Sequence, residues 1–406
     1  MSLFRTTRDK PTYAAIIEVG SGSALAAIVA SDPQQVTPQI IWSQRELAPL
    51  RDISALEETV RSILTALTAC AMNLEQTGRA ALRAYAPEAR ISEVHYSLAA
   101  PWAYTISKHV TYTQEEPFTI STGLLDELAT KAKEQIANEL IKNEQLAALN
   151  LQQISESTIA QYANGYRIRA PEGEHASTIR LDLAYILIPS RINDALKQLH
   201  DSIAANTPST HNSFMLSLYR ASRALFPQQQ EVCLVDITYA ATEIGIVRAG
   251  VLSYCTHTPF GSYSLARELA AIIDVPLHEA FGYLHTVRPF SFLEELSAPK
   301  KKDVEALLDA YVERLHKLFQ ATGDELSVPR SLIVHADLRS ESFFSRLIEQ
   351  AVKRTIRSSS HITPITDAIR RHYKTAIDNH PDAQQDTALL LMAYVFHMQH
   401  ATTAVH

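Results

Sequence analysis

A carboxylate at the end of a short apolar run is the first residue in this sequence that could do chemistry. Residues 232–235 are apolar and lead directly into Asp236, and residues 242–247 resume an alternating, β-branched pattern before a turn at residues 248–250. This pattern predicts a β-hairpin that presents Asp236 at its tip. A carboxylate in that position can cap its own turn or act on a bound ligand.

A second hairpin of the same design opens the chain. Residues 13–30 are predicted to form two apolar strands, with Glu18 near the end of the first strand and Gly20 and Gly22 in the turn. Ser21 and Ser23 add hydroxyl groups to this turn. Two hairpins that each end a strand on an acid indicate an internal repeat, in which one half of the fold duplicates the other.

The two hairpins resemble the two phosphate loops of the actin-like ATPase superfamily, specifically its bacterial cell-division (FtsA) and pilus-assembly (PilM) branch. The resemblance implies an α/β fold of the actin-like (ribonuclease H-like) type, duplicated, with an inserted small α+β subdomain. In that family, backbone N–H groups of the turns approach the nucleotide phosphates, while an Asp orients Mg²⁺ or water. Carried over to this chain, the cofactor-binding residues are Glu18, Gly20, Ser21, Gly22, Ser23, Asp236, Thr238 and Thr242.

The loops also depart from the family pattern, in ways that predict weak nucleotide binding. The first loop has Glu18 where the family has Asp, and the second has Thr238, Tyr239 and Ala240 in place of glycines. The Cβ atom and ring of Tyr239 would crowd a phosphate. Residues 336–338, Ala-Asp-Leu, stand where the family has a glycine triplet that packs against adenine and ribose. We therefore expect ATP with Mg²⁺ to bind weakly or not at all, assign no catalytic residue, and favour a degenerate ATPase over an enzyme.

The remaining elements set the expected domain organisation. From residue 101 to residue 190 the pattern changes to strands at 104–112, 154–168 and 178–188 around one helix at 121–141. This segment resembles the small extra subdomain of FtsA and PilM, here called SHS2-like. We expect a first half made of residues 1–100, 200–227 and 365–406, an inserted subdomain of residues 101–199, and a second half of residues 228–364.

Two segments outside the hairpins are assigned from composition. Residues 206–213 are polar and are predicted to be a linker. Residues 387–396 are apolar nearly all round and could form either a membrane-lying tail or a buried helix. The segment has no Lys or Arg on an opposite face, which favours a helix buried in the first half.

Composition excludes several classes of function. Eleven glycines among 406 residues is well below the usual share of roughly 7%, so few loops can be lined with glycine. A net charge of −7 without a basic stripe argues against nucleic acid as a partner. The three cysteines are interpreted as small core residues in a reducing compartment. His278 and His285 lie seven residues apart, too far for one ion, so no metal site is expected.

The sequence shows no signal-peptide pattern and no run long enough to span a bilayer, so we expect a cytoplasmic protein that reaches the membrane only through a partner. The resemblance implies a scaffold that recruits cell-division or type IV pilus assembly proteins and that could self-associate into filaments. The alternative is an actin-like ATPase that polymerises in a nucleotide-dependent way. A third possibility is a small-molecule kinase of the wider superfamily, against which the position of the insert argues.

Overall fold

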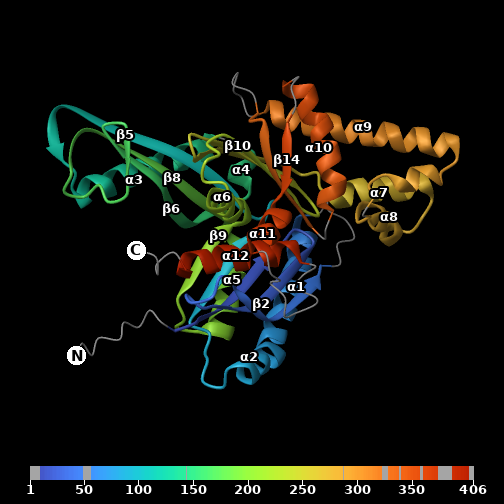
Figure 1. Cartoon of the computed structure of the whole chain (residues 1–406), viewed down its shortest axis with the longest axis horizontal. Coiled ribbons are helices and arrows are strands. Elements are labelled where there is room, and N and C mark those ends of the chain that lie inside the picture. Colours follow the sequence, from blue (N-terminus) through green and yellow to red (C-terminus); the bar gives the residue numbers. More distant parts are fainter. Residues whose placement is uncertain are drawn as a thin grey trace.

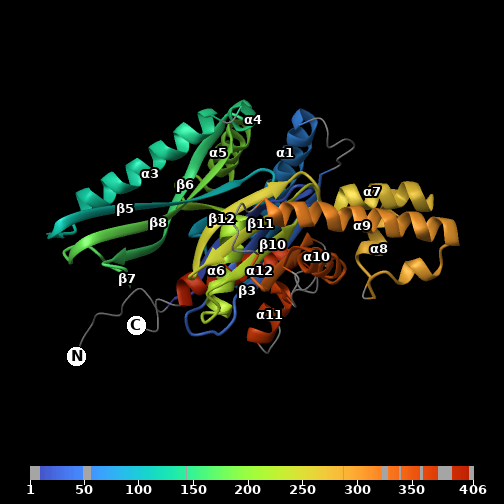
Figure 2. The same ribbon diagram turned by 90° about the horizontal axis from the view of Figure 1, so that it is seen from above.

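The structure is a computed structural model of the chain, and it describes residues 10–48, 56–142, 144–286, 288–321, 328–337, 340–356, 360–373 and 386–401. Its strands form three sheets (Figure 1). Two five-stranded sheets carry the two predicted hairpins, and a four-stranded sheet extends to one side. Seen from above, helix α3 runs along the outer side of this third sheet (Figure 2).

The first sheet has the strand order β3-β2-β1-β4-β9. β1 pairs with β2 in antiparallel fashion and with β4 in parallel, and β4 pairs with β9 in parallel. Nearly every residue of β1 and β2 is buried, because helices cover the sheet and its strands are short apolar runs. The strands are Thr12–Val19 (β1), Ser23–Ser31 (β2), Gln39–Leu47 (β3), Glu93–Leu98 (β4) and Ser209–Ser213 (β9).

The second sheet repeats the first one strand for strand. Its order is β12-β11-β10-β13-β14, with the same two antiparallel pairs followed by two parallel pairs. The predicted internal repeat is therefore confirmed at the level of topology. The strands are Val232–Ile237 (β10), Thr242–Arg248 (β11), Val251–Thr258 (β12), Ser331–Ala336 (β13) and His361–Pro364 (β14).

The third sheet is the inserted α+β unit. Its strands are all antiparallel in the order β5-β8-β6-β7, and its buried side chains form a hydrophobic cluster of their own with α3. The elements are Tyr104–Thr119 (β5), Thr122–Lys142 (α3), Glu144–Ala148 (α4), Leu151–Ala163 (β6), Tyr166–Ile168 (β7) and His175–Pro189 (β8).

Helices of the first half pack against the first sheet and against each other. α12 contacts β1, β2 and α6, and its residues from Thr387 to His397 are all buried. The expected buried position of the C-terminal apolar segment is thus confirmed. The helices are Leu56–Asn73 (α1), the π-helical turn Leu74–Gly78, Arg79–Tyr85 (α2), Ser190–Ala204 (α5), Phe214–Leu225 (α6), Ile365–Tyr373 (α11) and Thr387–Ala401 (α12).

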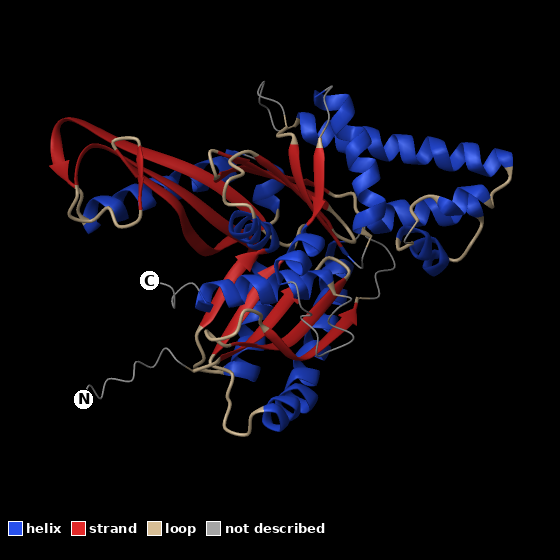
Figure 3. Cartoon of the chain, in the orientation of Figure 1, coloured by secondary structure: helices blue, strands red, loops and turns tan. Residues whose placement is uncertain are grey.

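Helices of the second half pack on the second sheet, and the long helix α9 contacts α7 and α10 (Figure 3). They are Ser262–Ile273 (α7), Leu277–Leu284 (α8), the 3₁₀ turn Ser291–Glu294, Ala298–Gln320 (α9) and Glu341–Ile356 (α10). No helix within the described ranges is both long and apolar enough to cross a bilayer.

Two expectations about local structure are wrong. The polar segment predicted to be a linker contains β9. The backbone of this segment pairs in parallel with β4, and only the last residues of β9 are buried, so a strand can form here without apolar side chains. The single strand predicted for residues 154–168 is two strands, β6 and β7, joined by a tight turn at Asn164 and Gly165. Both of these turn residues have positive φ, which Asn and Gly tolerate best.

Candidate functional site

The loop between β1 and β2 is the first predicted phosphate loop. The Gly20 N–H donates to Ser23 O at 3.0 Å, and the Trp102 indole N–H donates to Gly20 O at 2.8 Å. A Cβ atom at Gly20 would lie 2.7 Å from Glu18 Oε1. A side chain at residue 20 would therefore have to displace the Glu18 carboxylate.

The loop between β10 and β11 meets the first loop directly. The Ser21 hydroxyl donates to Thr238 Oγ1 at 2.9 Å and accepts the Ala240 N–H at 2.8 Å. The ring of Tyr239 packs against Gly22, where a Cβ atom would lie 2.4 Å from Tyr239 Cγ. Protein atoms therefore join the tips of the two hairpins across the space between them.

Glu18 of the first loop is held by a partly buried arginine. Arg45 Nη1 lies 2.8 Å from Glu18 Oε2 and also donates to Ser23 Oγ, and Arg45 pairs with both carboxylate oxygens of Asp386. Burial raises the pKa of Glu18, and Arg45 offsets only part of that effect. Burial would also raise the pKa of Asp386, but the charge of Arg45 reverses the effect and lowers it.

Asp236 of the second loop is held by a buried histidine. Its Oδ1 lies 2.7 Å from His335 Nδ1, and His335 Nε2 lies 3.0 Å from Thr387 Oγ1. Burial would lower the pKa of His335, but its hydrogen bond to Asp236 and the charge of Asp236 raise the pKa to about 9. The ring is an imidazolium at neutral pH, so each loop carboxylate faces a cation supplied by the chain itself.

Comparisons with known proteins agree with this arrangement of two hairpins in two matching sheets. One similar solved structure is described as "PilM-PilN type IV pilus biogenesis complex". The superposition includes 96% of this chain and 98% of the other chain, with 11% sequence identity and a TM-score of 0.56. This chain has an actin-like fold. No family model matches the sequence, and no curated protein is similar to it in sequence.

Two other solved structures are similar to this chain at lower TM-scores. One is the ethanolamine utilization protein EutJ from Carboxydothermus hydrogenoformans. Its superposition includes 94% of this chain and 90% of EutJ, with 11% sequence identity and a TM-score of 0.42. The other is a protein with an actin-like ATPase fold from Bacteroides thetaiotaomicron. Its superposition includes 96% of this chain and 99% of the other chain, also with 11% sequence identity and a TM-score of 0.42.

A cavity of about 360 Å³ opens beside the joined loops of the actin-like fold. Tyr239 stacks on Phe281 along one wall, with ring centroids 5.6 Å apart. Arg45, Asp337 and Asp386 supply the charged part of the lining. Desolvation raises the pKa of Asp337 to about 7, and nearby Glu18 and Asp236 add to this effect while His335 and Arg45 oppose it.

The structure places six of the eight predicted site residues together and the other two elsewhere. Six of them, Glu18, Gly20, Ser21, Gly22, Ser23 and Thr238, lie at the joined loops. Asp236 lies deeper, bound to His335, and its Oδ2 is buried without a hydrogen-bond partner among the described residues. Thr242 points away, because its hydroxyl donates to Phe260 O at 2.7 Å inside the second half.

Sequence reasoning missed Arg45 and His335, which bind the two acids, and Asp386, which binds Arg45. Arg45, His335 and Asp386 are separated from their partners by 27, 99 and 341 residues along the chain. Arg45 lies opposite Leu25 of β2, which lies opposite Glu18 of β1, so only the pairing of the three strands brings Arg45 to the acid. Leu338, part of the triplet that replaces the family glycines, lies outside the described residues.

Proposed function

We propose that this protein is an actin-like scaffold of the FtsA/PilM type that does not hydrolyse ATP and that recruits assembly partners. The observation that carries the proposal is the direct bonding of the two phosphate loops through Ser21, with Tyr239 packed against Gly22. Phosphate groups would have to occupy this space in an actin-like ATPase. Here a hydroxyl group and an aromatic ring fill it.

The charges around the loops support the same proposal. Phosphoryl transfer on this fold needs Mg²⁺ at the phosphates and a water molecule aimed in line with the bond that breaks. Glu18 Oε2 is bound to Arg45 and Asp236 Oδ1 to His335, so the chain itself already supplies a cation to one oxygen of each loop carboxylate. The cavity of about 360 Å³ is within the usual size range of ligand pockets, so weak nucleotide binding without hydrolysis fits it.

The proposed role is the assembly of partners in pilus biogenesis or cell division. The support is the similarity in fold to a protein solved in a PilM-PilN type IV pilus biogenesis complex. The scaffold would act in the cytoplasm and reach the membrane only through such a partner, either as single copies or as filaments. The inserted unit, with its own hydrophobic cluster, is the proposed SHS2-like surface for partner or self contacts.

Calorimetric titration with Mg-ATP, together with a phosphate-release assay, tests the loss of ATPase activity. We expect no turnover and at most weak binding. A dissociation constant in the low micromolar range with turnover, both lost in Asp236→Ala, would support the alternative, a polymerising ATPase.

Co-expression with a PilN-like protein or with a division-ring protein from the same genome tests the role in assembly. A stable complex with only one of them, isolated by size-exclusion chromatography, would identify the branch. Association with neither would contradict the recruitment role.

A further inference from the structure

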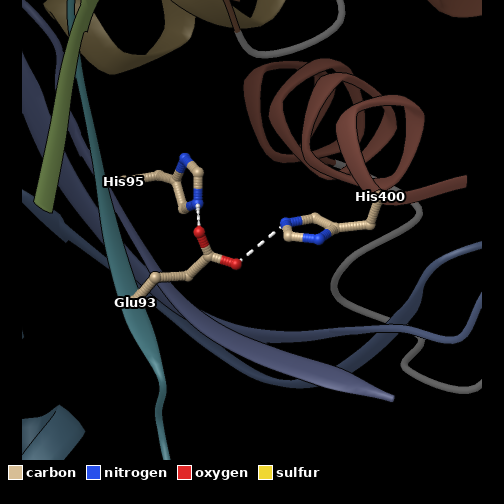
Figure 4. A group of neighbouring side chains, drawn as sticks. All are labelled: Glu93, His95 and His400. Atoms are coloured by element: carbon tan, nitrogen blue, oxygen red, sulfur yellow. Dashed lines mark ion pairs between the residues drawn. The ribbon is translucent and has the colours of Figure 1, made fainter. Parts of the chain in front are cut away.

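A cluster of two histidines and one glutamate lies on the first half, away from the joined loops. Glu93 and His95 both belong to β4, and His400 belongs to the last turn of α12 (Figure 4). Residues two apart on a strand point to the same face, so both β4 side chains meet the helix. The one nitrogen or oxygen atom that each residue offers as a ligand lies within 4.8 Å of the other two.

The distances within the cluster are close to those of a metal site. His400 Nε2 lies 2.8 Å from Glu93 Oε1, and His95 Nε2 lies 3.0 Å from Glu93 Oε2. Ligands of a tetrahedral Zn²⁺ ion, with bonds of about 2.0–2.2 Å, are separated by roughly 3.3–3.6 Å. Small rotations of the side chains would bring the three ligand atoms to this spacing.

The hydrogen bonds around His95 are those of a ligating histidine. Its Nδ1 lies 2.8 Å from Thr210 Oγ1 on β9, while its Nε2 faces Glu93 Oε2 at 3.0 Å. A metal-bound histidine typically donates its other ring N–H to an oxygen, which fixes the tautomer and the orientation of the ring. Glu93 therefore faces a histidine nitrogen with each of its carboxylate oxygens, His400 Nε2 with Oε1 and His95 Nε2 with Oε2.

Packing fixes both imidazole rings in place. Phe396 lies one turn before His400 on α12, and its ring makes edge contacts with the rings of His95 and His400. The ring centroids are 5.2 Å apart for His95 and 4.8 Å apart for His400. The side chains of the three ligands keep 12–27% of their surface exposed, so the cluster is open to solvent on one side. A water molecule could fill a fourth coordination position there.

We propose that Glu93, His95 and His400 form a binding site for a divalent transition-metal ion of the Zn²⁺ type. Imidazole nitrogen with one carboxylate oxygen is a ligand set that suits Zn²⁺ and its neighbours better than Mg²⁺ or Ca²⁺, which prefer oxygen alone. The ion fastens the C-terminal end of α12 to β4. It thereby couples the closing helix of the first half to the sheet that carries the first loop.

Titration of the untagged, chelator-treated full chain with Zn²⁺ tests the site by calorimetry, with Co²⁺ absorption as a second readout. We expect one ion per chain at mildly alkaline pH, a tetrahedral Co²⁺ spectrum, and a higher unfolding midpoint in the presence of Zn²⁺. His95→Gln, His400→Gln and Glu93→Gln should each weaken binding by at least about tenfold. His109→Gln, at an exposed histidine of the insert, should bind as the unchanged chain does.

Thr210→Val keeps all three ligands and removes only the oxygen that orients His95. This variant should weaken Zn²⁺ binding by about tenfold. It tests whether the three residues bind the ion even if the ligand variants fail to fold. Absence of binding by the unchanged chain would overturn the site and leave the cluster as an ion pair between a carboxylate and two histidines. Equal affinity in the unchanged chain and in Thr210→Val, or in the ligand variants, would also overturn it.

Discussion

The ring of Tyr239 lies against Gly22, so closely that a Cβ atom at residue 22 would sit 2.4 Å from Tyr239 Cγ. The second loop carries a large side chain where its actin-like relatives are expected to have glycine, and the first loop has kept a glycine that makes room for it. The two loops are therefore complementary to each other. Gly22 thus serves the packing between the two halves.

Gly22→Ala should destabilise the protein by about 1–3 kcal/mol, because the added methyl group forces the Tyr239 ring out of place. Chemical denaturation measures the change. Tyr239→Ala in the same chain should recover part of the loss, since the ring that clashes is gone. The interaction energy of this double-mutant cycle isolates the contact between the loops.

Gly282→Ala is the matched control for that cycle. Gly282 lies in α8, and no atom lies within 4 Å of a Cβ built there. Alanine should therefore be neutral or stabilise the helix by up to about 1 kcal/mol. A Gly22→Ala variant as stable as Gly282→Ala would contradict the packing of the two loops.

Arg45→Met should cost about 2–4 kcal/mol of unfolding free energy, because the buried Glu18 and the partly buried Asp386 would both lose their cation. Adding Glu18→Gln should recover part of the loss by removing one charge. Arg191→Met is the control, since its partner Glu57 and Arg191 itself are mostly exposed, and it should cost less than about 1 kcal/mol. Equal losses in the two arginine variants would show that Arg45 does not hold the loop acid.

The pH dependence of stability should report the pairing of His335 with Asp236. The pKa of His335 is raised from an ordinary 6.5 to about 9 in the folded chain, so its contribution is complete below pH 6.5 and is lost as pH rises to about 9. The pKa values of Asp337 and Glu341 are also raised, to about 7. These two groups therefore also make the unfolding free energy fall as pH rises, but mainly below about pH 7. The unfolding free energy should therefore fall between about pH 7 and pH 9.

His335→Gln isolates this effect. The variant should be less stable than the unchanged chain at pH 7, and its stability should change less between about pH 7 and pH 9, because glutamine does not titrate. Denaturant unfolding at a series of pH values measures both curves. Parallel curves would mean that His335 is not the group that gains a proton in the folded chain.

The sequence predicted the fold better than it predicted the site, and the reason is the range of the interactions. The hairpins, the helix at Phe214–Leu225 and the buried C-terminal helix follow from short patterns of apolar residues and turns. β9 escaped prediction because its five polar residues carry no pattern, and their strand conformation comes from pairing with β4.

The acids of the site were found because each ends an apolar strand, but their partners were not. Arg45 and His335 reach Glu18 and Asp236 only once the sheets have formed, since they come from other strands. The same holds for His400, which meets Glu93 only after α12 has packed on the first sheet. Local patterns identify the residues that can do chemistry, whereas tertiary contacts decide what they do.

Residues 101–199 should fold when expressed alone. Val110, Leu128 and Leu181 belong to a hydrophobic cluster made only of side chains from this segment. Circular dichroism should show both helix and strand with a cooperative thermal transition, and Leu128→Asp should abolish the transition. Ile186 and Ile188 of β8 pack into the core of the first half, so the excised unit will be less stable than it is in the full chain. An unfolded spectrum would contradict the assignment of a separate subdomain.

The full chain alone should fail to co-sediment with anionic vesicles. Leu389, Leu391 and Phe396 of α12 are at most 2% exposed, and moving them into a bilayer would empty the core of the first half. Each large apolar side chain lost from a core costs about 2–5 kcal/mol, more than its transfer into lipid returns. Neutral vesicles serve as the matched control, and an integral membrane partner added to the anionic vesicles should restore sedimentation. Strong sedimentation by the chain alone that persists at high salt would mean that α12 leaves its place, and would contradict recruitment through a partner.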